Sequence, residues 1–382
     1  MNEITNYLNE HLNDMIALTE KIINIDSFPT DVAGVQKVID VLADQMHELG
    51  METRQIDAGN PGTVLIGELA GQDDTAPVIL SGHMDTVFPA GTVAHHPFLL
   101  DGDKMMGPGI FDMKPGLVIA LFAVQALKEL GKIKRPIKMI FVSDEEKLHM
   151  GSNGHDILAT EAKGGAYGIN LEGSVAHDKV GTSNRGGMII DVTVHGIAAH
   201  SGAAPEKGRS AIIELAHQMI EFDALTDLAN GIHVNCGTVQ GGVSENIIPD
   251  LAKTSMGVRF KTNQQRDELL AKIKKIVTQP TIAGTKTEVT VRTQIDSMED
   301  TPEVEALFAD LNRVAEEIGY GTLHGGRGGG ASDAGVLVSQ GVPTIDGMEV
   351  IGEGSHTDHE NSSAKSMVDR ASLIANLIAE RG

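Results

Sequence analysis

Two kinds of hydrophobic pattern alternate along the chain. Short apolar runs, such as those within residues 77–87 and 137–142, predict buried strands, and longer segments with apolar positions at helical spacing, such as 35–50 and 116–131, predict helices. Strands that alternate with helices predict an α/β fold, here with a mixed, mainly parallel sheet between helices. Ligands of such sheets bind beyond the carboxyl ends of the strands, so the polar residues found there are the first candidates for function.

The pattern changes between residues 184 and 296. The segment GGMIIDVTVHG alternates apolar and polar residues, as a strand with one solvated face does, and the elements that follow have the order β-α-β-β-α-β. We therefore expect residues 184–296 to form an inserted α+β (ferredoxin-like) domain. Residues 1–183 and 297–382 are expected to form the α/β domain.

Composition and charge exclude several classes of function. The chain has 382 residues and a net charge of −23, which disfavours binding to nucleic acids and to anionic membrane surfaces. Cys236 is the only cysteine, so neither an internal disulfide framework nor a thiolate metal cluster can form, and its apolar surroundings predict a core residue. The N-terminus lacks the features of a secretory signal, and no apolar run approaches the ~18 residues of a membrane span. A cytoplasmic protein is the expectation.

A histidine and an aspartate follow the first apolar run, in the sequence GHMDT. Side chains alternate along a strand, so His83 and Asp85 are expected on the same face. His83 can then bind a metal ion while Asp85 holds its other ring nitrogen. The alternative is a surface histidine that happens to lie near an aspartate.

Asp112 lies in the loop GPGIFDMKPG, directly before an apolar helix. A loop shaped by prolines and glycines that presents one carboxylate suits a ligand. An N-cap of the next helix is an equally compatible interpretation.

Further acids and a second histidine occur at similar places. Glu145 and Glu146 follow the run at 137–142, Glu172 follows a third predicted strand, and His356 lies in the Gly-rich loop GEGSHTDHENS. Neighbouring like charges cost free energy unless a cation lies among them or one of them keeps a proton. Nitrogen and oxygen ligands suit divalent ions such as Zn²⁺, and a carboxylate can bridge two ions. Together these residues predict a metal site.

Five motifs carry a resemblance to a known family. The segments GHMDTV, GPGIFDMKPG, DEE, LEG and GSHTDHENSS occur in this order and resemble the M20 family of di-zinc exopeptidases and deacylases. The wording DGDKMMGPGIFDMK is most similar to the glutamate carboxypeptidase branch of that family. The resemblance covers essentially the whole chain, including the inserted domain.

The resemblance implies a role for each matching residue. His83 and His356 would each bind one of two Zn²⁺ ions, for which Co²⁺ or Mn²⁺ can substitute, and Asp112 would bridge them. Each ion would have one further acidic ligand, Glu146 or Glu172. Asp85 would orient His83, and Glu145 would be the general base that takes a proton from the bridging water and passes it to the leaving amine.

The inserted domain also resembles that of the family, where it is a lid that often dimerises. His200, in GIAAHSGAAPEKGRSAI, would stabilise the oxyanion in the active site of a partner protomer, so a homodimer is implied. Asn246 and Arg259 match substrate-binding segments, and Arg259 would clamp the substrate carboxylate. A solvent-exposed salt bridge is the alternative for Arg259. Gly330 belongs to GGASDA, whose backbone would line the substrate pocket.

The run Lys147–Met150 departs from the family pattern of an apolar residue, Gly and Ser after the acid pair. We interpret it as a short insertion near the metal site and His149 as an ordinary loop histidine. Arg327, in GGRGGG, is additional and could contact an acidic substrate.

The first functional hypothesis is a metal-dependent carboxypeptidase that removes a C-terminal amino acid, such as glutamate, from a small peptide or an N-acyl amino acid. An N-acyl-amino-acid deacylase or desuccinylase is the alternative within the family. A phosphate-binding loop at GGRGGGAS lacks the GK[ST] ending and basic surroundings. A non-catalytic binding scaffold would be expected to have lost a ligand or the base, and none is missing.

Overall fold

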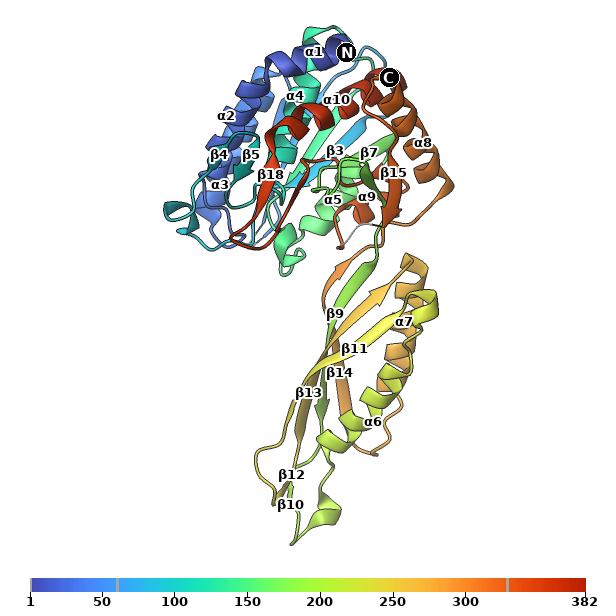
Figure 1. Ribbon diagram of the computed structural model, residues 1–382. Helices are drawn as coiled ribbons and strands as arrows, with labels where there is room; N and C mark the ends of the chain where they lie inside the picture. The colour runs from blue at the N-terminus through green and yellow to red at the C-terminus, as the bar shows by residue number, and fades with distance from the viewer. Residues whose placement is uncertain (1, 60–61, 328–329) are drawn as a thin grey trace. The chain divides into compact units, whose positions relative to one another are not determined.

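The computed structural model describes residues 2–59, 62–327 and 330–382, which form two compact units (Figure 1). Unit 1 comprises Met1–Asn184 and Met298–Gly382, and unit 2 comprises Arg185–Ser297. Each boundary lies one residue beyond the limit expected from the sequence. Within the described residues, no helix has the length and apolar character needed to cross a membrane.

Unit 1 is built on a six-stranded mixed sheet with the strand order β1-β2-β6-β3-β7-β16. The pairs β6/β3, β3/β7 and β7/β16 are parallel, and β1/β2 and β2/β6 are antiparallel. The strands are β1 (Glu52–Asp57), β2 (Thr63–Leu69), β3 (Val78–His83), β6 (Ile137–Val142), β7 (Tyr167–Asn170) and β16 (Thr344–Ile345). The predicted α/β fold with a mixed, mainly parallel sheet is confirmed.

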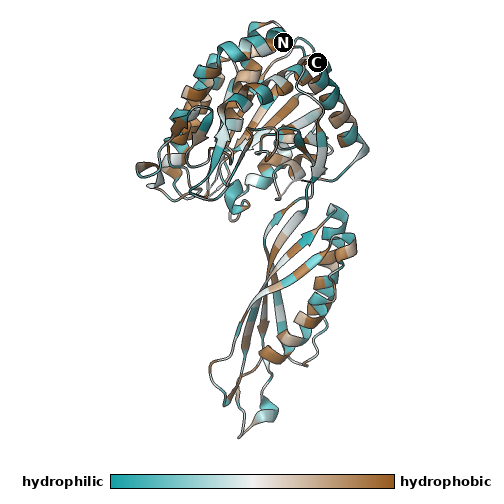
Figure 2. Cartoon of the chain, viewed as in Figure 1, coloured by the Kyte–Doolittle hydropathy of each residue, from teal (hydrophilic) through white to brown (hydrophobic). Residues whose placement is uncertain are grey.

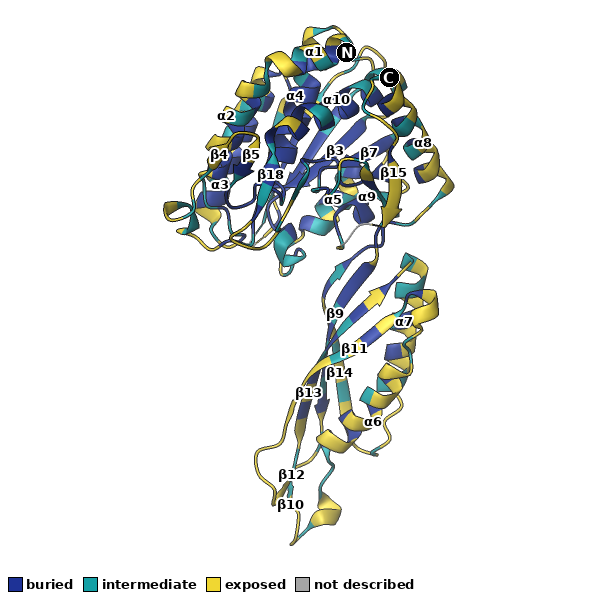
Figure 3. Ribbon diagram, viewed as in Figure 1, coloured by how far each residue is buried: buried dark blue, intermediate teal, exposed yellow. Residues whose placement is uncertain are grey.

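Helices cover both faces of this sheet. They are α1 (Glu3–Glu10), α2 (Leu12–Ile23), α3 (Val32–Glu48), α4 (Lys114–Glu129), α5 (Gly154–Ala162), α8 (Pro302–Glu317), α9 (Ala334–Ser339) and α10 (Ala364–Arg381). Helices α5 and α9 pack with Ile79 and Ile140 on one face, whereas the other helices pack with Val78 and Leu80 on the opposite face. Helix α4 is apolar almost all round because it lies between the sheet and α10, and Figure 3 shows it buried along its length.

Smaller strands of unit 1 complete the loops around the site. Strands β4 (Leu99–Asp101), β5 (Lys104–Met106), β17 (Gly352–Glu353) and β18 (Asn361–Ser363) form a four-stranded sheet. Strand β8 (Lys179–Ser183) pairs in parallel with β15 (His324–Arg327). Residues 324–327 therefore form a strand where the sequence predicted only a Gly-rich loop at 325–330, and residues 328–329 lie outside the described residues.

Unit 2 has a four-stranded antiparallel sheet in the order β11-β13-β9-β14, as in a ferredoxin-like fold. Its elements are β9 (Gly186–His195), β10 (Ala199–His200), α6 (Ala211–Asp223), β11 (His233–Gly241), β12 (Ile247–Ile248), β13 (Leu251–Phe260), α7 (Asn263–Val277) and β14 (Lys286–Ile295). Buried residues alternate along β9 and β13 because α6 and α7 cover one face of the sheet. Figure 2 shows this alternation as brown and pale bands along the strands.

Candidate active site

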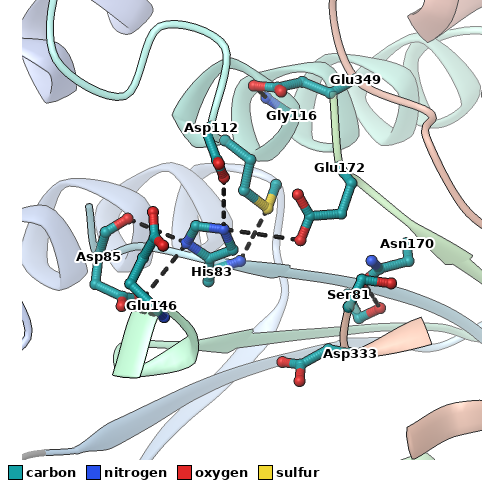
Figure 4. Close-up of polar contacts among 12 residues, drawn as sticks. Ser81, His83, Asp85, Asp112, Gly116, Glu146, Asn170, Glu172, Asp333 and Glu349 are labelled. Atoms are coloured by element: carbon teal, nitrogen blue, oxygen red, sulfur yellow. Dashed lines mark hydrogen bonds and ion pairs between the residues drawn. The ribbon is translucent and has the colours of Figure 1, made fainter. Parts of the chain in front are cut away.

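The first candidate metal group contains His83, Asp112 and Glu172 (Figure 4). His83 is the last residue of β3, and its Nε2 atom lies 3.1 Å from Asp112 Oδ1 and 3.8 Å from Glu172 Oε1. Its Nδ1 atom lies 3.1 Å from the backbone oxygen of Asp85 and 3.5 Å from Asp85 Oδ1. Because these oxygens accept hydrogen bonds, Nδ1 carries the proton and Nε2 presents its lone pair to the acids.

The second candidate metal group contains Asp112, Glu146 and His356. His356 Nε2 lies 3.1 Å from Asp112 Oδ2 and 3.3 Å from Glu146 Oε2. Asp112 thus belongs to both groups and directs one carboxylate oxygen into each. In each group the ligand atoms lie within 4.8 Å of one another, which is the arrangement that two ions bridged by one carboxylate require.

Buried acids from other parts of the chain shape the loop that presents Asp112. Glu360 accepts hydrogen bonds from the backbone N–H groups of Gly109 (3.1 Å) and Phe111 (2.7 Å), which fixes the loop directly before Asp112. Glu349 accepts a hydrogen bond from the N–H of Gly116 in the first turn of α4 (2.9 Å). The sequence analysis missed both acids, because nothing in their local sequence indicates burial.

The electrostatics of the cluster favour cations. Burial raises the pKa of Glu145 and of Glu172 well above the usual value, and it also raises the pKa of Glu146. Burial also acts to raise the pKa of Asp112, but the hydrogen bonds from His356 and His83 prevail and lower it. Three acids that are costly to ionise together are stabilised as anions when divalent ions lie among them.

The donor set fits such ions. It consists of imidazole nitrogens and carboxylate oxygens, which Zn²⁺ and similar ions accept. Glu146 Oε1 and Asp85 Oδ1 are buried and have no hydrogen-bond partner among the described residues. The residues present therefore suit a dinuclear metal site.

Glu145 lies beside the two groups in a cavity of about 700 Å³ that is lined entirely by unit 1. The lining includes Asp112, Glu146, Glu172 and His356 together with Lys179 and Arg327. Gly330 also lines this cavity. The structure thus brings the predicted metal ligands, the predicted base and one predicted substrate-binding residue to one place.

The acid turn after β6 differs from the expectation. His149 is not an ordinary loop histidine, because it is buried, with Nδ1 2.9 Å from Asp144 Oδ1 and Nε2 2.9 Å from Asp333 Oδ1. The carboxylates of Asp333 and Asp144 raise its pKa well above the usual value, although burial alone acts to lower it. The sequence gave a signal at HMGS, but Asp333 lies 184 residues further along the chain.

His200 and Asn246 lie together in unit 2. His200 pairs with Ile247 across β10 and β12, and the N–H of Ser201 donates to the backbone oxygen of Asn246 (3.0 Å). His200 Nδ1 accepts hydrogen bonds from the N–H groups of Gly202 and Ala203 (both 3.1 Å). The proton of the neutral ring is therefore on Nε2, which can donate a hydrogen bond.

Arg259 lies at the other end of the same sheet. It pairs with Gly187 near the start of β9, roughly 25 Å along β13 from Leu251 at ~3.3 Å per residue. A Cβ atom on Gly187 would lie 2.3 Å from the Arg259 guanidinium, so this glycine makes room for the arginine. Within the described residues Arg259 forms no ion pair, so the salt-bridge alternative gains no support.

Comparison with known proteins identifies relatives of the whole chain. The sequence profile of Peptidase family M20/M25/M40 matches residues 79–380. Carboxypeptidase G2 from Pseudomonas sp. (strain RS-16) is 30% identical over 379 residues, covering 96% of this chain and 89% of the relative. Succinyl-diaminopimelate desuccinylase from Corynebacterium glutamicum is 27% identical over 267 residues, covering 68% of this chain and 69% of the relative. The crystal structure of aminopeptidase PepT from Bacillus cereus ATCC 10987 matches with a TM-score of 0.76 at 25% identity, covering 97% of this chain and 98% of that chain. The resemblance found in the motifs is confirmed.

Proposed function

Because this chain belongs to Peptidase family M20/M25/M40 and is a metal-dependent hydrolase, we propose that it is a carboxypeptidase that removes a C-terminal amino acid from small peptides or N-acyl amino acids. The observation that carries this proposal is the position of Asp112 between two metal groups, with Glu145 in the same cavity. A relative named carboxypeptidase G2 that is similar over 96% of this chain supports the choice of reaction.

The proposal gives each residue of the cluster a task. His83 and Glu172 hold one ion, His356 and Glu146 hold the other, and Asp112 bridges them. We take both ions to be Zn²⁺, with Co²⁺ or Mn²⁺ as substitutes. When bound, such ions polarise the scissile carbonyl and lower the pKa of water to ~7.

Two further acids support the reaction. Asp85 holds His83 Nδ1 and, through Oδ2, accepts a hydrogen bond from the Glu146 N–H (3.0 Å), so it joins one ligand of each group. Glu145 takes a proton from the attacking water and passes it to the leaving amine, since burial raises its pKa towards the working pH.

Cationic side chains indicate an acidic C-terminal residue such as glutamate. Lys179 and Arg327 lie on the paired strands β8 and β15 and line the cavity that contains Glu145. They are suited to the substrate side chain, whereas the guanidinium of Arg259, without an ion pair among the described residues, is suited to bidentate binding of the α-carboxylate. Gly330 lines the same cavity and would contact the substrate through its backbone.

His200 and Asn246 are assigned to the active site of a second protomer. Since they lie at the opposite end of the unit 2 sheet from Arg259, the two ends of one unit 2 cannot bind the same small substrate. A homodimer in which unit 2 is a lid and dimerisation domain, and unit 1 the catalytic domain, resolves this conflict. His200 Nε2–H would then stabilise the oxyanion.

The alternative reaction is removal of an N-acyl group, such as succinyl, from an amino acid. The similarity to a succinyl-diaminopimelate desuccinylase favours it, and it would use the same metal cluster and base. The two reactions differ in which side of the scissile amide the cavity selects.

A hydrolysis screen tests the proposal. Purified protein loaded with Zn²⁺, Co²⁺ or Mn²⁺ is assayed on dipeptides and on N-acyl amino acids that end in glutamate, glutamine or leucine. The proposed function predicts the highest kcat/KM for C-terminal glutamate with varied N-terminal groups. A preference set by the acyl group and indifferent to the C-terminal residue would identify a deacylase instead, and no hydrolysis by the metal-loaded protein would refute both reactions.

A further inference from the structure

A buried ion cluster lies behind the acid turn, outside the two metal groups. The imidazole of His149 lies between Asp144 and Asp333, and the three side chains are only 3%, 2% and 4% exposed. Each ring nitrogen is 2.9 Å from a carboxylate oxygen. An ionised carboxylate only accepts hydrogen bonds, so both nitrogens donate and the ring is an imidazolium.

The cluster joins two segments that are far apart in the sequence. Asp144 directly precedes the 3₁₀ turn Glu145–Lys147, which carries the proposed base and one proposed metal ligand. Asp333 directly follows Ser332, which lines the cavity. The imidazolium therefore connects the acid turn to the loop that lines the substrate cavity.

The turn is held at several points on the same side. The N–H of His149 donates to the backbone oxygen of Asp144 (3.0 Å), and the hydroxyl of Ser152 donates to the Asp144 carboxylate. A Cβ atom on Gly154 would lie 2.6 Å from Asp144 Oδ1 and 2.7 Å from His149 Nδ1, so the cluster leaves no free space.

The backbone at His149 is in a conformation that L-residues rarely adopt. Leu148 and His149 both have φ of 53°, in the left-handed region that favours glycine. A non-glycine residue persists there only when its surroundings hold it in place. At His149 the two carboxylates provide that hold, and a glycine could not reach them.

We propose that His149 is a positioning residue for the hydrolytic reaction, because its imidazolium fixes the acid turn against the cavity loop through Asp144 and Asp333. Glu145 is thereby held facing the substrate. This inference rests on the proposed role of Glu145 as the base. It concerns a residue at which the chain departs from the pattern of its family.

The test compares His149→Gln with His155→Gln in the full-length, metal-loaded enzyme. His155 lies in the adjacent helix α5, with its ring 6.3 Å from that of His149, but it contacts neither Asp144 nor Asp333 in the hydrogen bonds and ion pairs of the described residues. We expect kcat of the His149 variant to fall ~10- to 100-fold, because a small misplacement of a catalytic group has an effect of this size. KM and the number of bound ions should change less than ~3-fold, and kcat of the His155 variant should stay at the wild-type value.

A second variant separates positioning from folding. His149→Gly suits the left-handed backbone and leaves a space between two carboxylates that imidazole can fill. Added imidazole should restore kcat of this variant several-fold and should not restore kcat of the Gln variant. The proposal is overturned if the Gln variant keeps wild-type kcat, if its loss of activity only follows a loss of bound metal, or if imidazole restores nothing.

The outcome for the wild-type enzyme distinguishes this inference from the function on which it rests. A metal-loaded wild-type enzyme that hydrolyses no substrate would refute the proposed function and this inference with it. An active wild-type enzyme with an equally active His149→Gln variant would refute the inference alone.

Discussion

Asp112→Asn should reduce the number of tightly bound ions from two to about one per chain. The two oxygens of Asp112 lie 3.1 Å from different histidines, Oδ1 from His83 Nε2 and Oδ2 from His356 Nε2, so each metal group depends on one of them. An amide keeps a single oxygen and directs an NH₂ group, which cannot bind a cation, into the other group.

The magnitude follows from the loss of one anionic ligand. A charged hydrogen-bonding partner contributes about 1.5–3 kcal/mol, which corresponds to a ~10- to 150-fold change in affinity and is a lower bound for a direct metal ligand. We expect the weaker ion to dissociate at least ~10-fold more readily. The ion at His356 is the one expected to be lost, because this histidine is 55% exposed whereas His83 is 1% exposed.

The assay is equilibrium dialysis against buffered Zn²⁺ followed by elemental analysis per chain. Glu349→Gln is the matched control, because Glu349 is a buried acid near the same cluster that belongs to neither metal group. Burial raises the pKa of Glu349 well above its usual value, and its Oε1 accepts the Gly116 N–H, which an amide oxygen also accepts. The control should keep both ions. Two tightly bound ions in Asp112→Asn, or equal losses in both variants, would show that Asp112 does not bridge.

Four further predictions concern single residues. Glu145→Gln should keep both ions and lower kcat by ~10²–10⁴, as measured by metal analysis and steady-state kinetics, and an active variant would place the base elsewhere. Arg259→Ala should raise KM for substrates with a free α-carboxylate ~10-fold or more but leave amidated analogues unchanged, and equal effects would exclude the clamp. His200→Ala mixed with Glu145→Gln should regain activity after proven subunit exchange if protomers share sites, whereas no recovery would argue against sharing. The pKa of His149 is raised in the folded protein above the ~6.5 of the unfolded chain, so its stabilisation is fully present below pH ~6.5 and is lost as the pH rises through the folded pKa. The difference in unfolding free energy between wild type and His149→Gln, from urea titrations, should therefore shrink above pH ~6.5, and a constant difference would contradict the imidazolium.

The sequence predicted those parts of the site that follow directly from strand ends and local motifs. His83 and Glu146 follow buried strands, and the parallel pairing of β3 with β6 brings the two strand ends together. Asp112 was ambiguous, since its loop also suited a helix N-cap. The structure shows that Met113, not Asp112, precedes the first residue of α4, so the carboxylate is free to join the two groups.

The parts that the sequence did not predict depend on distant residues. Strand β2 (Thr63–Leu69) was not predicted, although it pairs with β6 next to the acid turn. Glu360 lies about 250 residues from the loop it supports, and Asp333 lies 184 residues from His149. No local pattern distinguishes a buried, hydrogen-bonded acid from a solvated one when its partners come from elsewhere in the fold.

The three acids that follow β6 are stable side by side because each one faces a different partner. Asp144 is paired with the buried imidazolium of His149, Glu146 belongs to a metal group, and Glu145 faces the cavity. Two of the three negative charges are thus offset by cationic groups, whereas burial raises the pKa of Glu145. Its free energy of ionisation is therefore high unless a proton is exchanged with a substrate or water. The run of acids separates charges with structural tasks from one carboxyl group that is suited to proton transfer, and His149 is the residue that makes this separation complete.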